Sequence, residues 1–293
     1  MKNLIFTLFL LLITSNCFAY KAFFQLYDTH TENDIHNMFL VLKENDINHL
    51  IVQWISYNNQ PFFWQLEKDR YDAPFKYFDM NTKHIDIIFD LSIKYDIDLE
   101  IGLVYDESFW SMSNRNEDVV NVYLNRLYRE NTSIINSILL KYREHEKLKG
   151  FYIPQEIDDM TWNQNTHLMY NYINNVKQYL NDKYYYGELS ISFFLNGWIS
   201  PQKYSEFIDS FFVNSNIDKI YIQDSIGSEK MKLHESEYYI SNINHNEKIY
   251  IILEIFDDKY KYAPEDRIKS QYNMISKYTD NIILFSINNI MER

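Results

Sequence analysis

The chain has 293 residues, of which 28 are Lys or Arg and 41 are Asp or Glu, so its formal net charge is −13 at pH 7. This acidic balance repels phosphate backbones, and no basic cluster offsets it, which argues against nucleic acid as a partner and disfavours strongly anionic polysaccharides. The length suits one α/β barrel or two smaller domains; because no linker rich in Gly, Ser or Pro divides the chain, we expect a single domain.

The first 19 residues have the pattern of a secretory signal peptide. Lys2 gives a basic start, an apolar stretch covers residues 4–13, and the small residues Cys17 and Ala19 precede a cleavage site. The apolar stretch is shorter than the ~20 residues that a membrane span requires. We therefore expect cleavage before Tyr20, export to the periplasm or beyond, and no stable membrane anchor afterwards. Cys17 is the only cysteine, so residues 20–293 can form no disulfide.

Short runs of β-branched and aromatic residues, separated by segments with helical periodicity, predict eight strands. Their near-continuous hydrophobicity suits strands that are buried on both faces, as in a parallel sheet. In chain order they cover residues 23–28, 49–54, 98–105, 150–156, 189–195, 219–224, 248–254 and 281–287.

The segments between these strands place apolar residues three and four positions apart, which gives each predicted helix one apolar face. The stripes are Ile35, Met38, Phe39 and Leu42; Ile85, Ile88 and Phe89; and Tyr204, Phe207, Ile208 and Phe211. The repeated alternation predicts an α/β fold, the (β/α)8 TIM barrel, over residues 20–293, with an open doubly wound sheet as the alternative. Residues 288–293 are too few for a last helix of normal length, whereas residues 117–149 have room for two helices.

Two glutamates end predicted strands, Glu156 the fourth and Glu254 the seventh. In a barrel of parallel strands, such side chains project into the mouth where active sites are built. Alternation puts Tyr152 and Ile252 on the same side as these glutamates. Cleaving a glycosidic bond takes one carboxylic acid and one carboxylate, without a cofactor, so the pair predicts a glycoside hydrolase. Taken singly, each glutamate also fits an ordinary strand-end residue paired with Lys or Arg.

The other residues at the predicted mouth are aromatic, amide and carboxylate side chains. Aromatic rings offer flat apolar faces to sugars, while amides and carboxylates bind hydroxyl groups. Because Tyr and Phe are abundant throughout the chain, packing beneath loops is the alternative for the aromatic members. The predicted sugar-binding residues are Asp28, Gln53, Trp54, Tyr105, Asp106, Trp110, Gln155, Phe194, Trp198, Gln223, Asp224 and Phe256.

Other chemistries have no motif in the sequence. GxSxG, HExxH, GxGxxG and GxxxxGKS/T are all missing, and we expect no cofactor. The acidic cluster of Glu156, Asp158 and Asp159 could coordinate Ca²⁺ or Mg²⁺, but these ions need several convergent oxygens. A solvated loop face without a metal is the interpretation that we favour.

Several segments resemble the bacterial glycosidase-like TIM barrels of the domain of unknown function family 4434. They are FYIPQEID (151–158), SISFFLNGWISPQKYSEF (190–207), IYIQDSIG (220–227) and LEIF (253–256), and LIVQW (50–54) and IGLVYD (101–106) extend the resemblance over most of the chain. Their order is also similar to glycoside hydrolase clan A, which implies Glu156 as general acid/base and Glu254 as nucleophile. The chain departs from that clan in having Gln155 where Asn usually precedes the acid/base, and in lacking a Trp at the end of the eighth strand.

The leading hypothesis is an exported, retaining glycoside hydrolase acting on a neutral or weakly charged bacterial or environmental polysaccharide. Retention predicts carboxyl groups ~5 to 5.5 Å apart, and the acid role predicts that apolar walls and the charge of Glu254 raise the pKa of Glu156. The alternative is a non-catalytic carbohydrate-binding barrel that serves polysaccharide export or surface assembly. A barrel with no sugar site would instead bury its Trp residues and plug its mouth.

Overall fold

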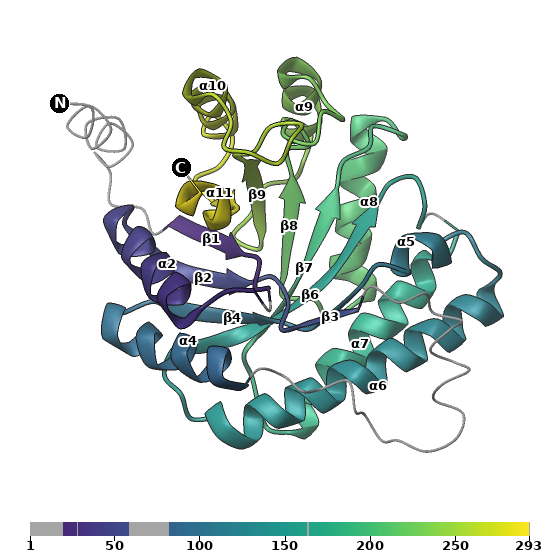
Figure 1. Ribbon diagram of the computed structural model, residues 1–293. Coiled ribbons are helices and arrows are strands. Elements are labelled where there is room, and N and C mark those ends of the chain that lie inside the picture. The colour runs from purple at the N-terminus through teal and green to yellow at the C-terminus, as the bar shows by residue number, and fades with distance from the viewer. Residues whose placement is uncertain (1–19, 28, 59–81, 163, 293) are drawn as a thin grey trace.

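The computed structural model describes residues 20–27, 29–58, 82–162 and 164–292, in which eight parallel strands close into a barrel (Figure 1). The strands are β1 (Tyr20–Phe24), β2 (Ile47–Val52), β4 (Asp98–Gly102), β6 (Leu148–Asp158), β7 (Glu188–Phe194), β8 (Lys219–Gln223), β9 (Ile249–Glu254) and β10 (Ile282–Phe285). Their order around the barrel is β1-β10-β9-β8-β7-β6-β4-β2. All eight predicted strands are present, and the fold is the (β/α)8 TIM barrel.

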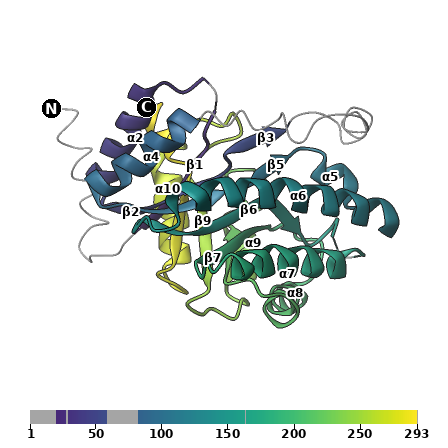
Figure 2. The same ribbon diagram turned by 90° about the horizontal axis from the view of Figure 1, so that it is seen from below.

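Helices connect the strands and surround the barrel in both ribbon views (Figures 1 and 2). The predicted apolar stripes face inward: in α2, for example, Ile35, Met38, Phe39 and Leu42 are all buried. The helices are α2 (Glu32–Glu44), α4 (Thr82–Tyr95), α5 (Phe109–Met112), α6 (Glu117–Tyr142), α7 (Thr166–Asp182), α8 (Pro201–Asn214), α9 (Leu233–Ile240), α10 (Glu265–Ile275) and α11 (Ile287–Met291).

Of two helical segments with a particular expectation, the first differs from it and the second agrees with it. The stretch with room for two helices holds one long helix, α6, of 26 residues, which runs beside α7. It has no interior Gly or Pro that would break it. After β10 the chain forms the five-residue helix α11, which lies against α2 and β1. A shortened last helix therefore closes the ring.

A small parallel sheet lies outside the barrel and was not predicted. The predicted strand 98–105 ends its barrel pairing at Gly102, and β5 (Val104–Asp106) then pairs with β3 (Ser56–Asn58). A side chain at Gly102 would collide with the main chain of Val52 and Gln53, so glycine permits this close crossing. The register places Tyr57 directly beside Tyr105.

The barrel interior holds two layers of side chains, an apolar layer nearer the carboxyl ends of the strands and an ionic layer nearer their amino ends. The apolar layer consists of Phe23, Ile51, Tyr152, Tyr221, Ile252 and Ile283, with Tyr250 and Phe285 packed against it. Tyr152 and Ile252 thus lie on the barrel axis, as alternation predicted. Phe23 meets Tyr152 edge to face, with ring centroids 5.2 Å apart.

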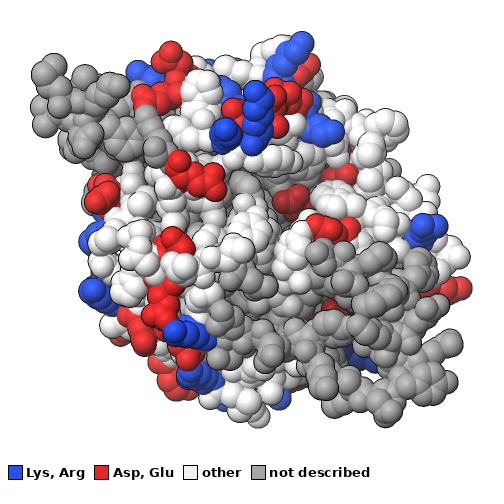
Figure 3. Space-filling model, viewed as in Figure 1, with Lys and Arg blue, Asp and Glu red and all other residues white. Residues whose placement is uncertain are grey.

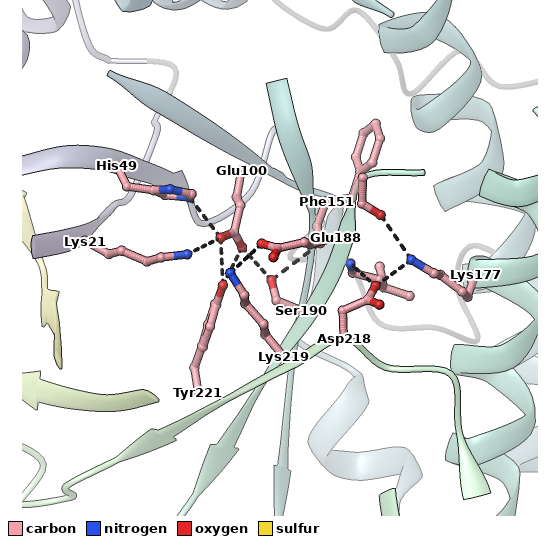
Figure 4. A network of polar contacts seen from close by, with 12 residues as sticks. Lys21, His49, Glu100, Phe151, Lys177, Glu188, Ser190, Asp218, Lys219 and Tyr221 are labelled. Atoms are coloured by element: carbon pink, nitrogen blue, oxygen red, sulfur yellow. Dashed lines mark hydrogen bonds and ion pairs between the residues drawn. The ribbon is translucent and has the colours of Figure 1, made fainter. Parts of the chain in front are cut away.

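The ionic layer is centred on Glu100, which is fully buried in β4 (Figure 4). Its carboxylate lies 2.8 Å from Lys21 Nζ and 2.9 Å from His49 Nε2, and it accepts hydrogen bonds of 2.7 Å from Ser190 Oγ and 2.6 Å from Tyr221 OH. We call these five residues the floor network. Burial alone would raise the pKa of Glu100, but the charge of Lys21 and the contact with His49 hold it well below its ordinary value.

Among the residues that are coloured in Figure 3, the Lys and Arg side chains are dispersed among Asp and Glu and form no large basic patch on that face. Among the described helices, none is both long and apolar enough to cross a membrane.

Candidate active site at the carboxyl ends of the barrel strands

β6 departs from regular pairing where it carries Glu156. Its register with β7 shifts between Ile153 and Ile157, because β7 advances only from Ile191 to Phe193 over the same stretch. Extra residues on one strand form a bulge, which bends the strand and re-aims its side chains. The direction of Glu156 is therefore set by this bulge and not by alternation from Tyr152.

The Glu156 side chain is half-buried and interacts with Gln223 at the end of β8. Burial raises the pKa of Glu156 to about 7; the charge of Asp158 adds to the rise and the hydrogen bond with Gln223 opposes it. The direction and the dominant cause agree with the expectation for an acid. The neighbouring charge differs, because it comes from Asp158 and not from Glu254.

Glu254 ends β9 and is buried. Its Oε2 accepts a 2.8 Å hydrogen bond from the Ser228 main-chain N–H, while Oε1 has no hydrogen-bond partner among the described residues. Gly227 lies so close that a Cβ there would stand 2.7 Å from Glu254 Cβ and 3.0 Å from Oε2. The loop after β8 therefore fixes one carboxylate oxygen of Glu254 and leaves the other without a donor.

The two glutamates are electrostatically linked. The pKa of Glu254 is raised first by burial, then by the charge of Asp224, and also by the charge of Glu156. Within the described residues, neither glutamate belongs to an ion pair. Both are thus buried or half-buried carboxyl groups with raised pKa values at the ends of the fourth and seventh barrel strands.

Asp224 lies behind Glu254 and is fully buried. Gln271 of α10 joins the two residues, since its Nε2 donates to Asp224 Oδ2 at 2.7 Å and to the Glu254 main-chain oxygen at 3.1 Å. Burial raises the pKa of Asp224, and the charge of Arg267 opposes the rise. Because Asp224 and Glu254 repel each other when both are ionised, the pair tends to keep one proton near neutral pH.

Four aromatic residues form a connected group at the ends of β1, β2 and β4, which we call the aromatic rim. The Trp54 ring has centroid distances of 5.7 Å to Tyr27, 5.5 Å to Tyr57 and 5.1 Å to Tyr105. Trp54 itself is buried, with its Nε1 bonded to Leu26 O at 2.7 Å, while Tyr27 and Tyr57 are 42% and 45% exposed. Burial and then the charge of Glu156 raise the pKa of Tyr105, so the rim reaches toward Glu156.

The other predicted sugar-binding residues vary in exposure. Gln53 and Gln155 are buried, and Gln155 Nε2 donates to Val104 O at 2.6 Å. Asp106 is buried in an ion pair with Arg126, and Phe256 is also buried. The half-buried members are Trp110 and Phe194, the exposed one is Trp198, and Asp28 lies outside the described residues.

The acidic residues after Glu156 do not form the solvated loop face that we favoured. Asp158 and Asp159 are buried. Asp159 accepts hydrogen bonds from the main-chain N–H groups of Asn196, Trp198 and Ile199, at 2.7 to 3.1 Å. It thereby fastens the loop after β7 to the end of β6. In the described part of the chain, no three His, Cys, Asp or Glu side chains gather as a metal site.

Sequence reasoning missed several residues of this region. Gln271 carries a signal, because it is a polar residue on the buried stripe of α10 beside Ile268 and Met274. Phe285, at the end of β10, contacts both Phe23 and Phe256, at centroid distances of 5.5 and 5.9 Å. It is the last residue of an obvious apolar run, and the peptide bond that follows it is cis.

Residues 22–293 match the family model described as "Domain of unknown function (DUF4434)". The chain belongs to this family. No curated protein matches the sequence.

Solved structures similar to this DUF4434 protein include several that are named as glycoside hydrolases. A protein from Bacteroides thetaiotaomicron, provisionally assigned as an alpha-L-fucosidase, is 16% identical over 92% of this chain and 87% of that chain, with a TM-score of 0.68. An endo-1,4-beta-mannanase from Rhizomucor miehei is 14% identical over 92% and 85%, with a TM-score of 0.56. A fungal beta-1,4-galactanase is 10% identical over 91% and 88%, with a TM-score of 0.52. At these identities the likeness shows a shared fold.

Proposed function

We propose that this DUF4434 protein is an exported, retaining glycoside hydrolase that uses Glu156 as general acid/base and Glu254 as nucleophile. The observation that carries the proposal is the placement of both glutamates at the carboxyl ends of the fourth and seventh barrel strands, where both have raised pKa values and the charge of Glu156 helps to raise the pKa of Glu254. Carboxyl groups near neutral pKa can exchange protons at physiological pH, as glycosidic cleavage requires.

In the first step, Glu156 donates its proton to the glycosidic oxygen as the bond to the anomeric carbon breaks. A pKa of about 7 keeps a large fraction of this carboxyl protonated at neutral pH. Gln223, which interacts with Glu156, helps to hold its orientation. Glu156 then accepts a proton from the water that hydrolyses the covalent intermediate, and its original protonation state is restored.

Attack on the anomeric carbon requires an ionised Glu254. Glu254 can act as the nucleophile when the proton shared by Asp224 and Glu254 resides on Asp224, which leaves the charge on Glu254. The Ser228 N–H then stabilises Oε2. Oε1 lacks a donor among the described residues and is shielded from solvent, and in this proposal it forms the bond to the sugar once the substrate has entered. Gln271 keeps Asp224 in place behind the nucleophile.

The substrate that we propose is a neutral or weakly charged oligo- or polysaccharide. The net charge of −13 disfavours strongly anionic polymers. The signal-like residues 1–19 support action outside the cytoplasm. β-1,4-Mannan and β-1,4-galactan are sensible first substrates, because proteins named for their cleavage share this fold.

The decisive experiment compares the protein with Glu156→Gln and Glu254→Gln on a polysaccharide panel, scoring reducing ends. We expect release by the wild type and a loss of ~10² or more in both variants. Because a retaining enzyme preserves the configuration at the anomeric carbon, proton NMR of the first product should show the same anomeric configuration as the substrate. Saturable binding without release, unchanged by either substitution, would contradict the proposal and favour a carbohydrate-binding barrel.

A further inference from the structure

A short hairpin follows Glu254 at the mouth of the barrel. Phe256 and Tyr262 form an antiparallel bridge, and the Asp257 N–H donates to Lys261 O at 2.7 Å. The Asp257 side chain accepts hydrogen bonds of 2.9 Å from the main-chain N–H groups of Lys259 and Lys261. The turn is thus held by its own hydrogen bonds and begins two residues after the proposed nucleophile.

Tyr260 stands at the tip of this hairpin with a left-handed backbone, at φ +56°. Such a φ is uncommon for a bulky residue and costs free energy, and it persists only where surrounding contacts enforce it. Two contacts do so: the Tyr260 N–H donates to Asp257 O at 2.9 Å, and Asn289 Nδ2 donates to Tyr260 O at 2.8 Å. The fold therefore holds an unfavourable conformation that presents the Tyr260 side chain, which is 75% exposed.

One face of the Tyr260 ring is backed by Phe256. The two rings stack with centroids 5.4 Å apart and planes 14° from parallel. Phe256 in turn contacts Phe285, and Phe285 contacts Phe23 in the apolar layer on the barrel axis. Tyr260 makes no other ring contact in the described part of the protein. A line of aromatic rings thus runs from the barrel axis to an exposed ring beside the strand end of Glu254.

Tyr184 offers a comparison elsewhere in the molecule. It has nearly the same backbone, at φ +55°, and it is 77% exposed. It follows the carboxyl end of α7, where a left-handed residue commonly ends a helix, and it precedes β7, at the opposite end of the barrel from the proposed site. Helix termination accounts for the left-handed backbone of Tyr184, whereas no described helix ends at Tyr260.

We propose that Tyr260 is a sugar-stacking residue of the subsite next to Glu254, where it binds a neutral pyranose unit of the substrate chain. This inference rests on the proposed function and extends it to a chain of several sugars. A pyranose with an apolar C–H face would cover the exposed face of Tyr260, while its hydroxyl groups remain hydrated at the rim. Phe256 and the hydrogen-bonded turn hold the ring ready, so little conformational freedom is lost on binding.

The test uses Tyr260→Ala, Tyr260→Phe and the matched control Tyr184→Ala, each checked for folding by thermal melting. With β-1,4-mannan and β-1,4-galactan oligosaccharides, Tyr260→Ala should raise KM by roughly 3- to 10-fold, the order of one aromatic contact, with little change in kcat. Tyr260→Phe keeps the ring and should resemble the wild type, as should Tyr184→Ala. Equal KM values for Tyr260→Ala and Tyr184→Ala would overturn the inference.

Calorimetry with the Glu156→Gln variant separates this inference from the proposed function. The same oligosaccharides should bind this variant more weakly when Tyr260→Ala is added. If the wild type cleaves nothing but this loss of affinity is seen, the hydrolase proposal fails and the subsite stands. If cleavage is seen but affinity does not depend on Tyr260, the subsite fails and the hydrolase proposal stands.

Discussion

Replacing Glu156 by Gln should remove a pH dependence of folding stability that the wild-type protein carries. Burial raises the pKa of Glu156 from 4.5 to about 7, so the folded protein holds this proton over a range in which the unfolded chain has lost it. A raised folded-state pKa contributes stability that is fully present below the unfolded pKa and is lost as the pH rises through the folded pKa. At about 1.4 kcal/mol per pKa unit, the contribution amounts to about 3 kcal/mol.

The assay is guanidinium denaturation of the wild type and Glu156→Gln at several pH values between about 5 and 8.5. The difference in unfolding free energy should shift in favour of Gln by about 1.4 kcal/mol per pH unit between about pH 5 and pH 7, about 3 kcal/mol in all, and should level off above about pH 7. Glu144→Gln, at an exposed position just after the carboxyl end of α6, controls for the substitution itself. A difference that does not vary with pH would refute the raised pKa, and with it the role of Glu156 as an acid near neutrality.

Three further predictions follow from the barrel interior and the loop after β8. Lys21→Met leaves the buried charge of Glu100 without its cation and should lower the free energy of unfolding by about 3 to 5 kcal/mol in denaturation experiments. Lys141→Met breaks only an exposed ion pair and should have little effect. An equal loss of stability in both variants would contradict the role given to the floor network. In Gly227→Ala, the added methyl group would collide with Glu254 and should lower kcat ~10²-fold. Circular dichroism should show that the fold is retained. Unchanged turnover would mean that the loop shifts to accommodate the methyl group. Asp224→Asn removes a charge that raises the pKa of Glu254, so the acidic limb of the pH–rate profile should move to lower pH, and an unmoved limb would show that Asp224 does not act on Glu254.

The barrel could be predicted because its strands are buried on both faces and therefore form near-continuous apolar runs between amphipathic helices. The ends of the strands were less predictable. β1 ends at Phe24, although its strand was predicted to continue to residue 28, and the run after β4 leaves the barrel at Gly102 to pair with β3. Apolar patterning shows that a segment is buried, but it does not say which neighbour the segment pairs with.

The candidate site, like the barrel, was predictable from the sequence only in part. The positions of Glu156 and Glu254 near the carboxyl ends of the fourth and seventh strands could be predicted, because the apolar runs that they follow mark those strands. The bulge in β6 and the contact of Gln271 with Asp224 could not be predicted, since both depend on how separate elements meet in space. Tyr260 could not be singled out either, because its exposure follows from a backbone conformation that no local motif announces.

The floor network limits how this chain could be divided into smaller pieces. Glu100 is bonded to Lys21, which is 79 residues earlier, and to Ser190 and Tyr221, which are 90 and 121 residues later. A chain cut between β6 and β7 would leave the carboxylate in one fragment and both hydroxyl donors in the other. Because a buried charge without its donors is costly, neither fragment is a self-sufficient half barrel. The chain should therefore gain its structure only after β8 has been added, and a clipped chain should stay open to proteolysis.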